Sequence, residues 1–302
     1  MKTTLPPLHL FLALAVMVVW GTNFVIIHFA VQHMPPLLMA ALRFSFAAFP
    51  ALLFVKRPKV PWRHLAAYGV FIGAGQFGIL FIAMKDQIAP GLVSLVVQSQ
   101  VFFTIGLSMA LTHEKVRGFQ VAALGLAVAG LGVILAHTGA DATALGLGLT
   151  LLAALCWAIG NTIARASGPV NMLGYVVWSS PFAVPPLIVL SLVFDGWPAM
   201  LHGLTHAGAA IRAAVLWQSA GNTLFGYAAW AWLLARYPTA SVTPLALLVP
   251  VVGMATAAVV VGEPLQAWKL AAASLVMSGL AINTLWPAIY RRFTPALRTP
   301  AA

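Results

Sequence analysis

The sequence predicts an all-α integral membrane protein whose ten transmembrane helices form two inverted five-helix repeats, and three observations lead to that prediction. Hydrophobic residues make up 62% of the 302 residues, and charged residues only 7%. Apolar runs long enough to cross a membrane recur along the chain, and the basic residues lie mainly in the connections between them. A soluble domain carries roughly 25% charged residues, so this composition excludes an ordinary soluble enzyme.

The predicted spans are apolar runs of about 20 residues, enough for a helix to cross a hydrocarbon core of ~30 Å. In chain order they cover 8–31, 36–55, 65–84, 88–111, 119–137, 145–164, 171–194, 211–235, 238–261 and 268–290. The longest connection, 195–210, leaves room for an interfacial helix. The first run lacks a small-residue cleavage site followed by a polar region, so we interpret it as an uncleaved span.

The distribution of Lys and Arg predicts how the spans are oriented. With the N-terminus inside, the cytoplasmic positions are Lys2, Lys56, Arg57, Lys59, Arg63, Lys115, Arg117, Arg165, Arg236, Arg291, Arg292 and Arg298. The opposite side holds only Lys85, Arg212 and Lys269. Cytoplasmic loops carry the excess of Lys and Arg, so this asymmetry predicts that both termini are cytoplasmic. The basic residues do not cluster on one helix face with aromatics, which argues against a nucleic-acid partner.

Two stretches separated by 149 residues resemble each other and predict an internal repeat. Glu114 precedes Ala122, Ala123, Leu126, Gly130 and Leu131, and Glu263 precedes Ala271, Ala272, Leu275, Gly279 and Leu280. In the predicted topology Glu114 lies on the inner side and Glu263 on the outer side. A duplicated unit with five spans must insert in opposite senses, as in many secondary transporters. The alternative is that each glutamate lies at a membrane boundary and caps the next helix.

Several stretches of the chain carry a resemblance to a known family. The residues AALRF at 40–44, the segment 90–114 and the run from PLALLVPV at 244–251 to Gly262-Glu263 resemble the EamA family of the drug/metabolite transporter superfamily. A closer resemblance, to bacterial O-acetylserine/cysteine exporters, rests on VWGTNF at 19–24, VKRPKVP at 55–61 and LVVQSQVFFT at 95–104. The resemblance covers essentially the whole chain.

The resemblance implies both an organisation and a function. It implies a first five-helix repeat at 1–137, a second at 145–290 and a cytoplasmic tail at 291–302. It implies a secondary active exporter of small amino acids and derivatives, which works by alternating access in the bacterial inner membrane. The expected partners are an amino-acid-like substrate and membrane lipids, with no cofactor and no required oligomer. Exporters of other metabolites or drugs, such as aromatic amino acids or nucleosides, are the alternative.

Arg43 is the charged residue that the sequence places well inside a span, about 10 Å from the outer boundary at 1.5 Å per residue. A charged side chain facing lipid is costly, so Arg43 is expected to face the protein interior. There it could pair with a substrate carboxylate in bidentate geometry. The alternative is that Arg43 binds helix carbonyl groups and holds two spans together.

The remaining candidates for a substrate cavity are amides and aromatic residues within the spans. They can offer donors, acceptors and ring faces to a small zwitterion. The candidates are Trp20, Asn23, Gln76, Gln98, Gln100, Trp157, Asn161, Trp178, Asn222 and Tyr227. The alternative for each amide is a hydrogen bond between helices. Small-residue pairs such as Gly69 with Gly73, Gly125 with Ala129 and Gly253 with Ala257 predict close helix contacts.

An intramembrane enzyme or a non-transporting scaffold is the alternative from another class. The histidines His9, His28, His33 and His64 are scattered without acids nearby, and the sequence contains no HExxH or GxSxG motif. Its one cysteine, Cys156, excludes an internal disulfide and a cysteine metal motif. No carboxylate lies deep in a predicted span, which argues against a sodium site or an acidic proton relay. The absence of a Walker motif argues against ATP as the direct driving force.

Overall fold

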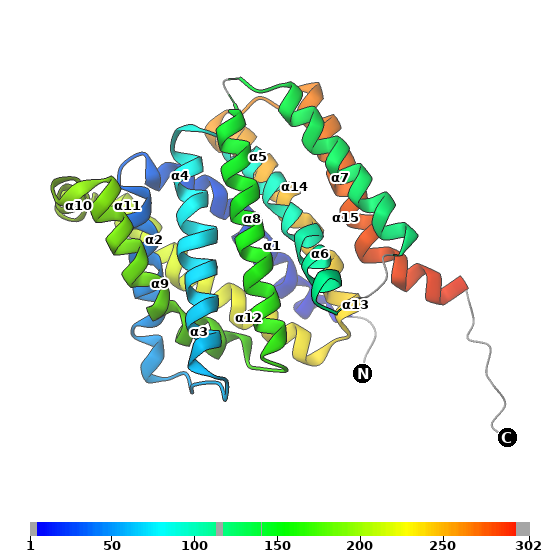
Figure 1. The fold of residues 1–302 in the computed structure, drawn as a ribbon, viewed down its shortest axis with the longest axis horizontal. Helices are drawn as coiled ribbons and strands as arrows, with labels where there is room; N and C mark the ends of the chain where they lie inside the picture. The colour runs from blue at the N-terminus through cyan, green and yellow to red at the C-terminus, as the bar shows by residue number, and fades with distance from the viewer. Residues whose placement is uncertain (1–4, 113–116, 140, 294–302) are drawn as a thin grey trace.

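The computed structural model describes residues 5–112, 117–139 and 141–293, and over these ranges the chain folds into helices without a β-strand. The helices run side by side across the molecule (Figure 1). Nine helical stretches among the described residues are long and apolar enough to cross a membrane. The expected eighth span is also helical, from Ala209 to Arg236, but Gln218, Ser219 and Asn222 make its middle more polar.

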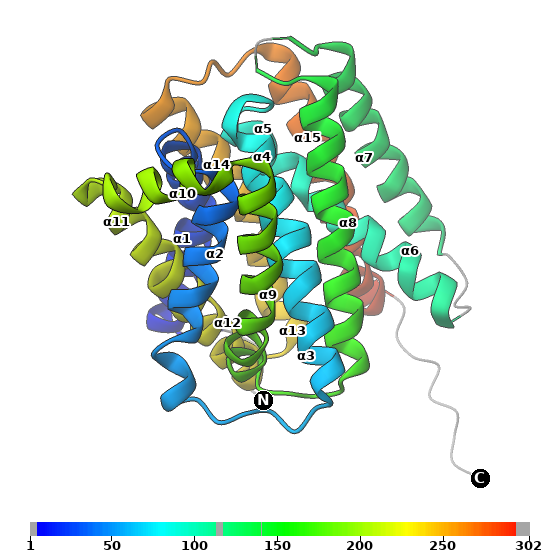
Figure 2. The ribbon, with the colours of Figure 1, turned by 60° about the vertical axis from the view of Figure 1, so that its left-hand side comes forward.

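The elements follow one another as expected from the apolar runs, with some spans built from several helical pieces. The first half contains α1 (Pro7–Val31), α2 (Pro36–Ala48), η1 (Ala51–Leu53), α3 (Trp62–Gly69), η2 (Val70–Gly78), α4 (Ile79–Asp86), α5 (Pro90–Val96), η3 (Val97–Ser99), α6 (Gln100–Thr112) and α7 (Gly118–Ala136). The second half contains α8 (Ala144–Ala166), α9 (Met172–Phe194), α10 (Gly196–Thr205), α11 (Ala209–Leu216), η4 (Trp217–Phe225), α12 (Gly226–Arg236), α13 (Thr239–Val242), η5 (Thr243–Leu247), α14 (Leu248–Thr256), η6 (Ala257–Val261) and α15 (Ala267–Phe293). The short α10 occupies the long connection in which the sequence left room for a helix (Figure 2).

The two halves depart from regular α-helix geometry at matching places. The third span of each half contains a π-helical segment, η2 in the first half and η4 in the second. The fourth span of each half contains a 3₁₀ segment, η3 in the first half and η5 in the second. Such segments change the direction in which side chains point, and they occur frequently at functional sites.

The pair formed by α7 and α15 shows the inverted relationship between the halves most directly (Figure 1). At one end of the pair His137 stacks on Trp268, with ring centroids 5.0 Å apart. At the other end Phe119 stacks on Trp286, with centroids 6.4 Å apart. Phe119 and Trp268 are 149 residues apart, as are His137 and Trp286. The repeat therefore converts one contact into the other with the two helices exchanged. The predicted inverted repeat is therefore confirmed, although Glu114 itself lies outside the described residues.

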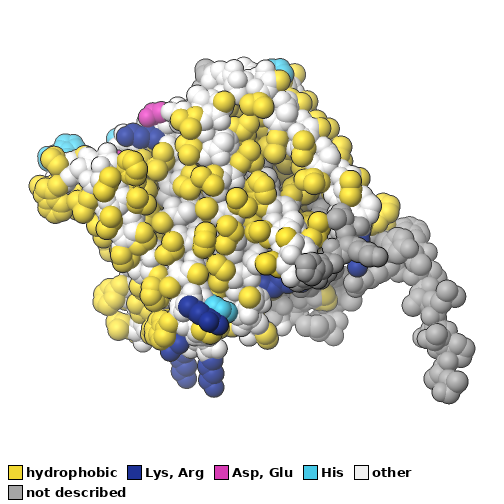
Figure 3. Space-filling model, in the orientation of Figure 1, with side chains coloured by type: hydrophobic (Ala, Val, Ile, Leu, Met, Phe, Trp, Pro, Cys, Tyr) yellow, Lys and Arg dark blue, Asp and Glu magenta, His cyan; other side chains and the backbone are white. Residues whose placement is uncertain are grey.

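The helix bundle has two opposite ends, each named after one of its residues. The Glu263 end carries the connections 32–35, 87–89, 137–139 with 141–143, and 262–266, and the Lys56 end carries 54–61, 167–171 and 237–238. Between them, hydrophobic side chains cover much of the visible face, and Lys and Arg side chains gather at the lower edge (Figure 3). An apolar belt between polar ends is what a membrane-spanning bundle requires.

Close backbone contacts hold the helices together at some of the expected glycines. A Cβ atom added at Gly69 would come within 2.2 Å of the Ser179 carbonyl oxygen, and one at Gly73 within 2.1 Å of Ala183 Cβ. Both contacts join the third span to α9, as the small-residue pattern predicts. Gly125 is different, because nothing among the described residues lies within 4 Å of an added Cβ there. The expected contact at Gly125 is therefore wrong, and α7 uses Gly130 instead.

Candidate functional site

A cavity of about 380 Å³ lies between the two halves and is the best candidate for a ligand site. Its size falls within the range of small-molecule pockets. Both halves contribute to its wall, including the π segments η2 and η4. Ten of the eleven residues predicted from the sequence line it, namely Trp20, Asn23, Arg43, Gln76, Gln98, Gln100, Trp157, Asn161, Asn222 and Tyr227.

Trp178 is the predicted residue that the structure does not bring into this cavity. Its indole Nε1 donates a hydrogen bond to the Val55 carbonyl oxygen at 2.8 Å. Its ring makes an edge contact with Trp62, with centroids 6.1 Å apart. Trp178 therefore anchors α9 to the connection between α2 and α3 at the Lys56 end. The sequence could not reveal this, because position within a span does not fix which face of the helix a residue occupies.

Arg43 lies at the centre of a buried polar network that joins the two halves. The Arg43 side chain is almost completely buried. Its Nε donates to Thr223 Oγ1 at 3.2 Å and its Nη1 donates to Gln218 Oε1 at 2.8 Å. Gln218 Nε2 in turn donates to Asn23 Oδ1, and Ser219 Oγ donates to the Arg43 carbonyl oxygen. Arg43 therefore links α2 to η4, which favours the role of holding two spans together.

The same guanidinium carries a positive charge without an acidic partner. Among the described residues, the only salt bridges are those of Lys269, and none involves Arg43. The Phe77 ring lies under the guanidinium, with 3.7 Å between Cζ and the ring centroid. Neutral side chains and a ring face solvate the cation only in part. An anionic ligand group would therefore find a favourable partner at Arg43.

The amides that border the cavity differ in whether other side chains hold them. Asn161 Nδ2 donates to Gln100 Oε1 at 3.0 Å, and Asn23 accepts from Gln218. Gln76 differs, because it is only 3% exposed and its Oε1 has no hydrogen-bond partner in the described part of the chain. A buried acceptor without a donor is unfavourable by about 1–3 kcal/mol. Among the described amides of this wall, Gln76 is therefore the one whose side-chain oxygen is buried without a donor.

Aromatic side chains form another part of the wall. Trp20 lies next to Tyr227 and Trp230, with ring centroids 5.8 and 5.5 Å apart. Trp20 Nε1 donates to the Asn222 carbonyl oxygen at 3.2 Å, which fixes the indole between α1 and η4. These rings offer apolar surface and electron-rich faces to a small ligand.

Several residues of the site were not predicted from the sequence. Gln218 and Thr223 bind Arg43, while Tyr68, Phe77 and Trp230 line the cavity. For Gln218 a signal existed, since it is an amide within a predicted span like those that were selected. For Phe77 and Trp230 no signal existed, because many spans contain several aromatic residues and only the fold shows which ones face the cavity.

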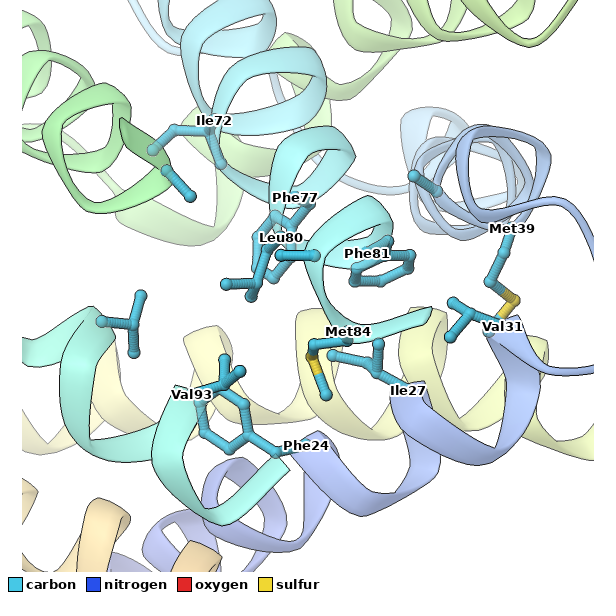
Figure 4. Close-up of a cluster of buried hydrophobic side chains, with 14 of the residues drawn as sticks. Phe24, Ile27, Val31, Met39, Ile72, Phe77, Leu80, Phe81, Met84 and Val93 are labelled. Atoms are coloured by element: carbon cyan, nitrogen blue, oxygen red, sulfur yellow. The ribbon is translucent and has the colours of Figure 1, made fainter. Parts of the chain in front are cut away.

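The cavity is closed toward the Glu263 end by packed hydrophobic side chains (Figure 4). Ile27 and Leu80 line the cavity, and beyond them Val31, Phe81 and Met84 are almost completely buried. In the other direction the lining includes Met172 at the start of α9 and Leu234 near the end of α12. The cavity therefore extends toward the Lys56 end and is sealed from the Glu263 end.

A charged cluster ties the two halves together at the Glu263 end. Lys269 Nζ lies 3.1 Å from Asp141 Oδ2 and 2.9 Å from Glu263 Oε1, and its side chain is fully buried. Glu263 Oε2 accepts a hydrogen bond from Gly91 N at 2.9 Å, at the start of α5. The sequence places Lys269 among the loop charges, but the structure buries it. Glu263 lies in the connection between η6 and α15 rather than at a helix start, and the backbone amide that its side chain caps belongs to the other half.

The equivalent position in the first repeat does not form such a cluster. Lys269 is the third residue of α15, and 149 residues earlier Gln120 is the third residue of α7. Gln120 Oε1 accepts from the Arg117 backbone amide at 2.9 Å, so it caps its own helix. The ionic connection between the halves therefore depends on Lys269, whereas Gln120 at the equivalent position contributes no ion pair.

Comparison with known proteins agrees with this architecture. Residues 8–136 and 144–285 match the EamA-like transporter family. A probable amino-acid metabolite efflux pump of Salmonella typhimurium is 43% identical over 279 residues, covering 90% of this chain and 93% of that protein. Its counterpart of the same description in Escherichia coli K12 is 42% identical over 278 residues, with the same coverage.

More distant relatives share the fold. A probable terminal-alkyne amino-acid exporter of Streptantibioticus cattleyicolor is 25% identical over 251 residues, covering 82% of this chain and 80% of that protein. A solved crystal structure superposes with a TM-score of 0.60 at 19% identity, covering 93% of this chain and 97% of the other. At that identity the superposition shows the fold alone.

Proposed function

Because the chain belongs to the EamA-like transporter family, we propose that it exports small amino acids and derivatives of the O-acetylserine and cysteine kind. Export takes place across the bacterial inner membrane by alternating access, with both termini cytoplasmic. The relatives described as amino-acid metabolite efflux pumps support this substrate class. The repeats at 1–137 and 145–290 act as the two moving halves, and 291–302 forms a cytoplasmic tail.

The observation that carries the proposal is a cavity between the two halves with one buried cation and no carboxylate among its described lining residues. A zwitterion brings the anionic group that Arg43 lacks. Since the excess of basic residues lies at the Lys56 end, that end faces the cytoplasm. The cavity then extends toward the cytoplasm and is closed toward the outside, which is the state that receives a substrate for export.

Counterflow in liposomes tests the proposal. Purified protein is reconstituted with unlabelled cysteine or O-acetylserine inside, and entry of the labelled compound is measured against protein-free liposomes. We expect accumulation of these compounds in the protein-containing liposomes alone. A panel with aromatic amino acids and nucleosides separates the proposal from the alternative substrates. Transport of nucleosides without transport of small amino acids would show that the proposed substrate class is wrong.

A further inference from the structure

Gln76 combines three features that no other described residue of the cavity combines. Its side chain lies in the cavity wall, it is 3% exposed, and its Oε1 atom is itself buried without a hydrogen-bond donor. The amide also lies in a π-helical stretch of backbone, where regular side-chain placement is interrupted. The protein therefore keeps an acceptor in a buried wall without using it for its own folding.

The position of Gln76 relates it to the cationic centre of the cavity. The next residue, Phe77, carries the ring that lies 3.7 Å from Arg43 Cζ. One short stretch of η2 thus contributes both the surface under the guanidinium and the unused acceptor. Arg43 has donors only, whereas the Gln76 carbonyl is an acceptor. An α-amino acid has the complementary pair of groups, a carboxylate that accepts and an ammonium that donates.

The ammonium group of such a ligand would need neutral acceptors, because no carboxylate is among the residues that line the cavity in the described chain. The side-chain oxygens of Gln100 and Asn23 already accept hydrogen bonds from Asn161 and Gln218. Of the other described amides in the wall, Gln76 is the one whose oxygen is buried without a donor. Rotation about the terminal torsion of a glutamine is soft, so the Gln76 carbonyl can turn toward a donor that enters. Ring faces of Trp20 and Tyr227 would complete the surroundings of the cation.

We infer that Gln76 accepts a hydrogen bond from the substrate ammonium and that, together with Arg43 at the carboxylate, it makes the cavity selective for zwitterionic amino acids. This inference rests on the proposed function, because it assigns the second pole of the same site. It makes Gln76 a specificity-determining residue for the amine. It also explains why the protein leaves a buried acceptor unpaired when no substrate is present.

Three ligands that differ only in the charged groups test the inference. L-Cysteine has both groups, cysteamine has the ammonium alone, and 3-mercaptopropionate has the carboxylate alone. Affinity is measured from ligand-induced thermal stabilisation of the purified full-length protein under reducing conditions, since a ligand that binds the folded state raises its stability. Counterflow with labelled cysteine provides the transport readout.

The Gln76→Met variant removes the acceptor and keeps the volume. It should weaken cysteine and cysteamine binding by about tenfold or more, the usual contribution of a hydrogen bond to a charged group. Binding of 3-mercaptopropionate should not change. Because Gln76 Oε1 has no protein partner to lose, the unliganded variant should unfold at the same temperature as the wild type or at a higher one. If Gln76 had only a structural role, Gln76→Met would lower the unfolding temperature of the unliganded protein and would not weaken the binding of cysteine and cysteamine selectively.

Two further variants make the test discriminating. Gln76→Glu keeps the acceptor and adds a negative charge, so it should bind cysteamine more tightly than the wild type does. Gln120→Met is the control, because Gln120 is a glutamine outside the cavity whose Oε1 is already paired with the Arg117 backbone amide. It should not change binding of any of the three ligands.

The outcomes separate the inference from the proposed function. If Gln76→Met weakens all three ligands by the same factor, or none of them, Gln76 does not bind the amine and the inference is overturned while the function stands. If the wild-type protein responds to none of the three ligands in either assay, the substrate class is wrong and the inference falls with it.

Discussion

Gly130 in α7 packs directly against the backbone of Ala272 in α15, so that an added Cβ would lie 2.9 Å from the Ala272 carbonyl oxygen. The equivalent contact is made in the opposite sense, because a Cβ at Gly279 would lie 2.5 Å from the Ala123 carbonyl oxygen. Residues 123 and 130 become 272 and 279 when 149 is added. The two helices therefore meet through a contact that is repeated by the internal symmetry, and in which a methyl group cannot be accommodated without moving backbone.

Substituting Gly279 by Ala is expected to destabilise the protein by about 1–3 kcal/mol, the usual effect of overpacking. The backbone of α7 has to move, since the atom in contact is a carbonyl oxygen. Thermal unfolding in detergent measures the effect. Gly132→Ala in α7 is the matched control, because nothing described lies within 4 Å of its added Cβ and alanine favours helix. An equal loss in both variants would contradict the contact.

Lys269→Met is expected to destabilise the protein by about 3–5 kcal/mol, because it leaves the buried Glu263 carboxylate without its cation. The double variant Lys269→Met with Glu263→Gln should recover part of this loss, since the glutamine is neutral and can still accept from Gly91. Chemical unfolding of the single and double variants gives the coupling between the two residues. Lys85→Met, at an exposed lysine of the same end, should have little effect. Additive losses would show that the pair does not interact.

Arg43→Lys is expected to lose both stability and transport, although it keeps the positive charge. An ammonium cannot reproduce the planar group that bonds Thr223 and Gln218 while lying on Phe77. Arg43→Ala should weaken cysteine binding more than cysteamine binding, because only cysteine has a carboxylate. Folded protein is selected by size-exclusion chromatography before both measurements. Wild-type transport of cysteine by Arg43→Ala would show that Arg43 neither binds the substrate nor supports the site.

Trp178→Phe is expected to leave substrate affinity unchanged, because Trp178 contacts Val55 and Trp62 rather than the cavity. It should lower the free energy of unfolding by about 1 kcal/mol through the lost hydrogen bond to the Val55 carbonyl oxygen. Ligand-induced stabilisation and unfolding of the same sample separate the two effects. A change in affinity at unchanged stability would return Trp178 to the substrate site.

Cysteines introduced at Lys59 and Pro264, in a Cys156→Ala background, are expected to differ in their accessibility to an impermeant thiol reagent. Both positions are exposed, but they lie at opposite ends of the bundle. In intact cells with the outer membrane permeabilised, Pro264→Cys should react and Lys59→Cys should react only after lysis. Equal reactivity before lysis would contradict the crossing of the membrane, and the reverse pattern would contradict the orientation.

The sequence by itself determined the class of the protein and most of its architecture. Hydropathy is a property of consecutive residues, so the apolar runs predict spans that the structure shows as helices, and the span at 209–236 is found despite its polar middle. The spacing of Glu114 and Glu263 also indicated the inverted repeat, which the paired contacts of α7 and α15 display. Most of the ten predicted cavity residues were found because polar side chains are unusual enough inside apolar spans to be noticed.

Only the tertiary structure decided how these side chains are used. It directs Trp178 away from the cavity and joins Arg43 to Gln218 and Thr223. It also buries Lys269 between two acids and leaves Gln76 Oε1 without a partner among the described residues. Each of these relationships depends on the rotation of one helix against another, and in η2 and η4 on a π-helical backbone. A linear pattern cannot specify that rotation, because residues in contact at the cavity can lie 202 positions apart in the sequence, as Trp20 and Asn222 do.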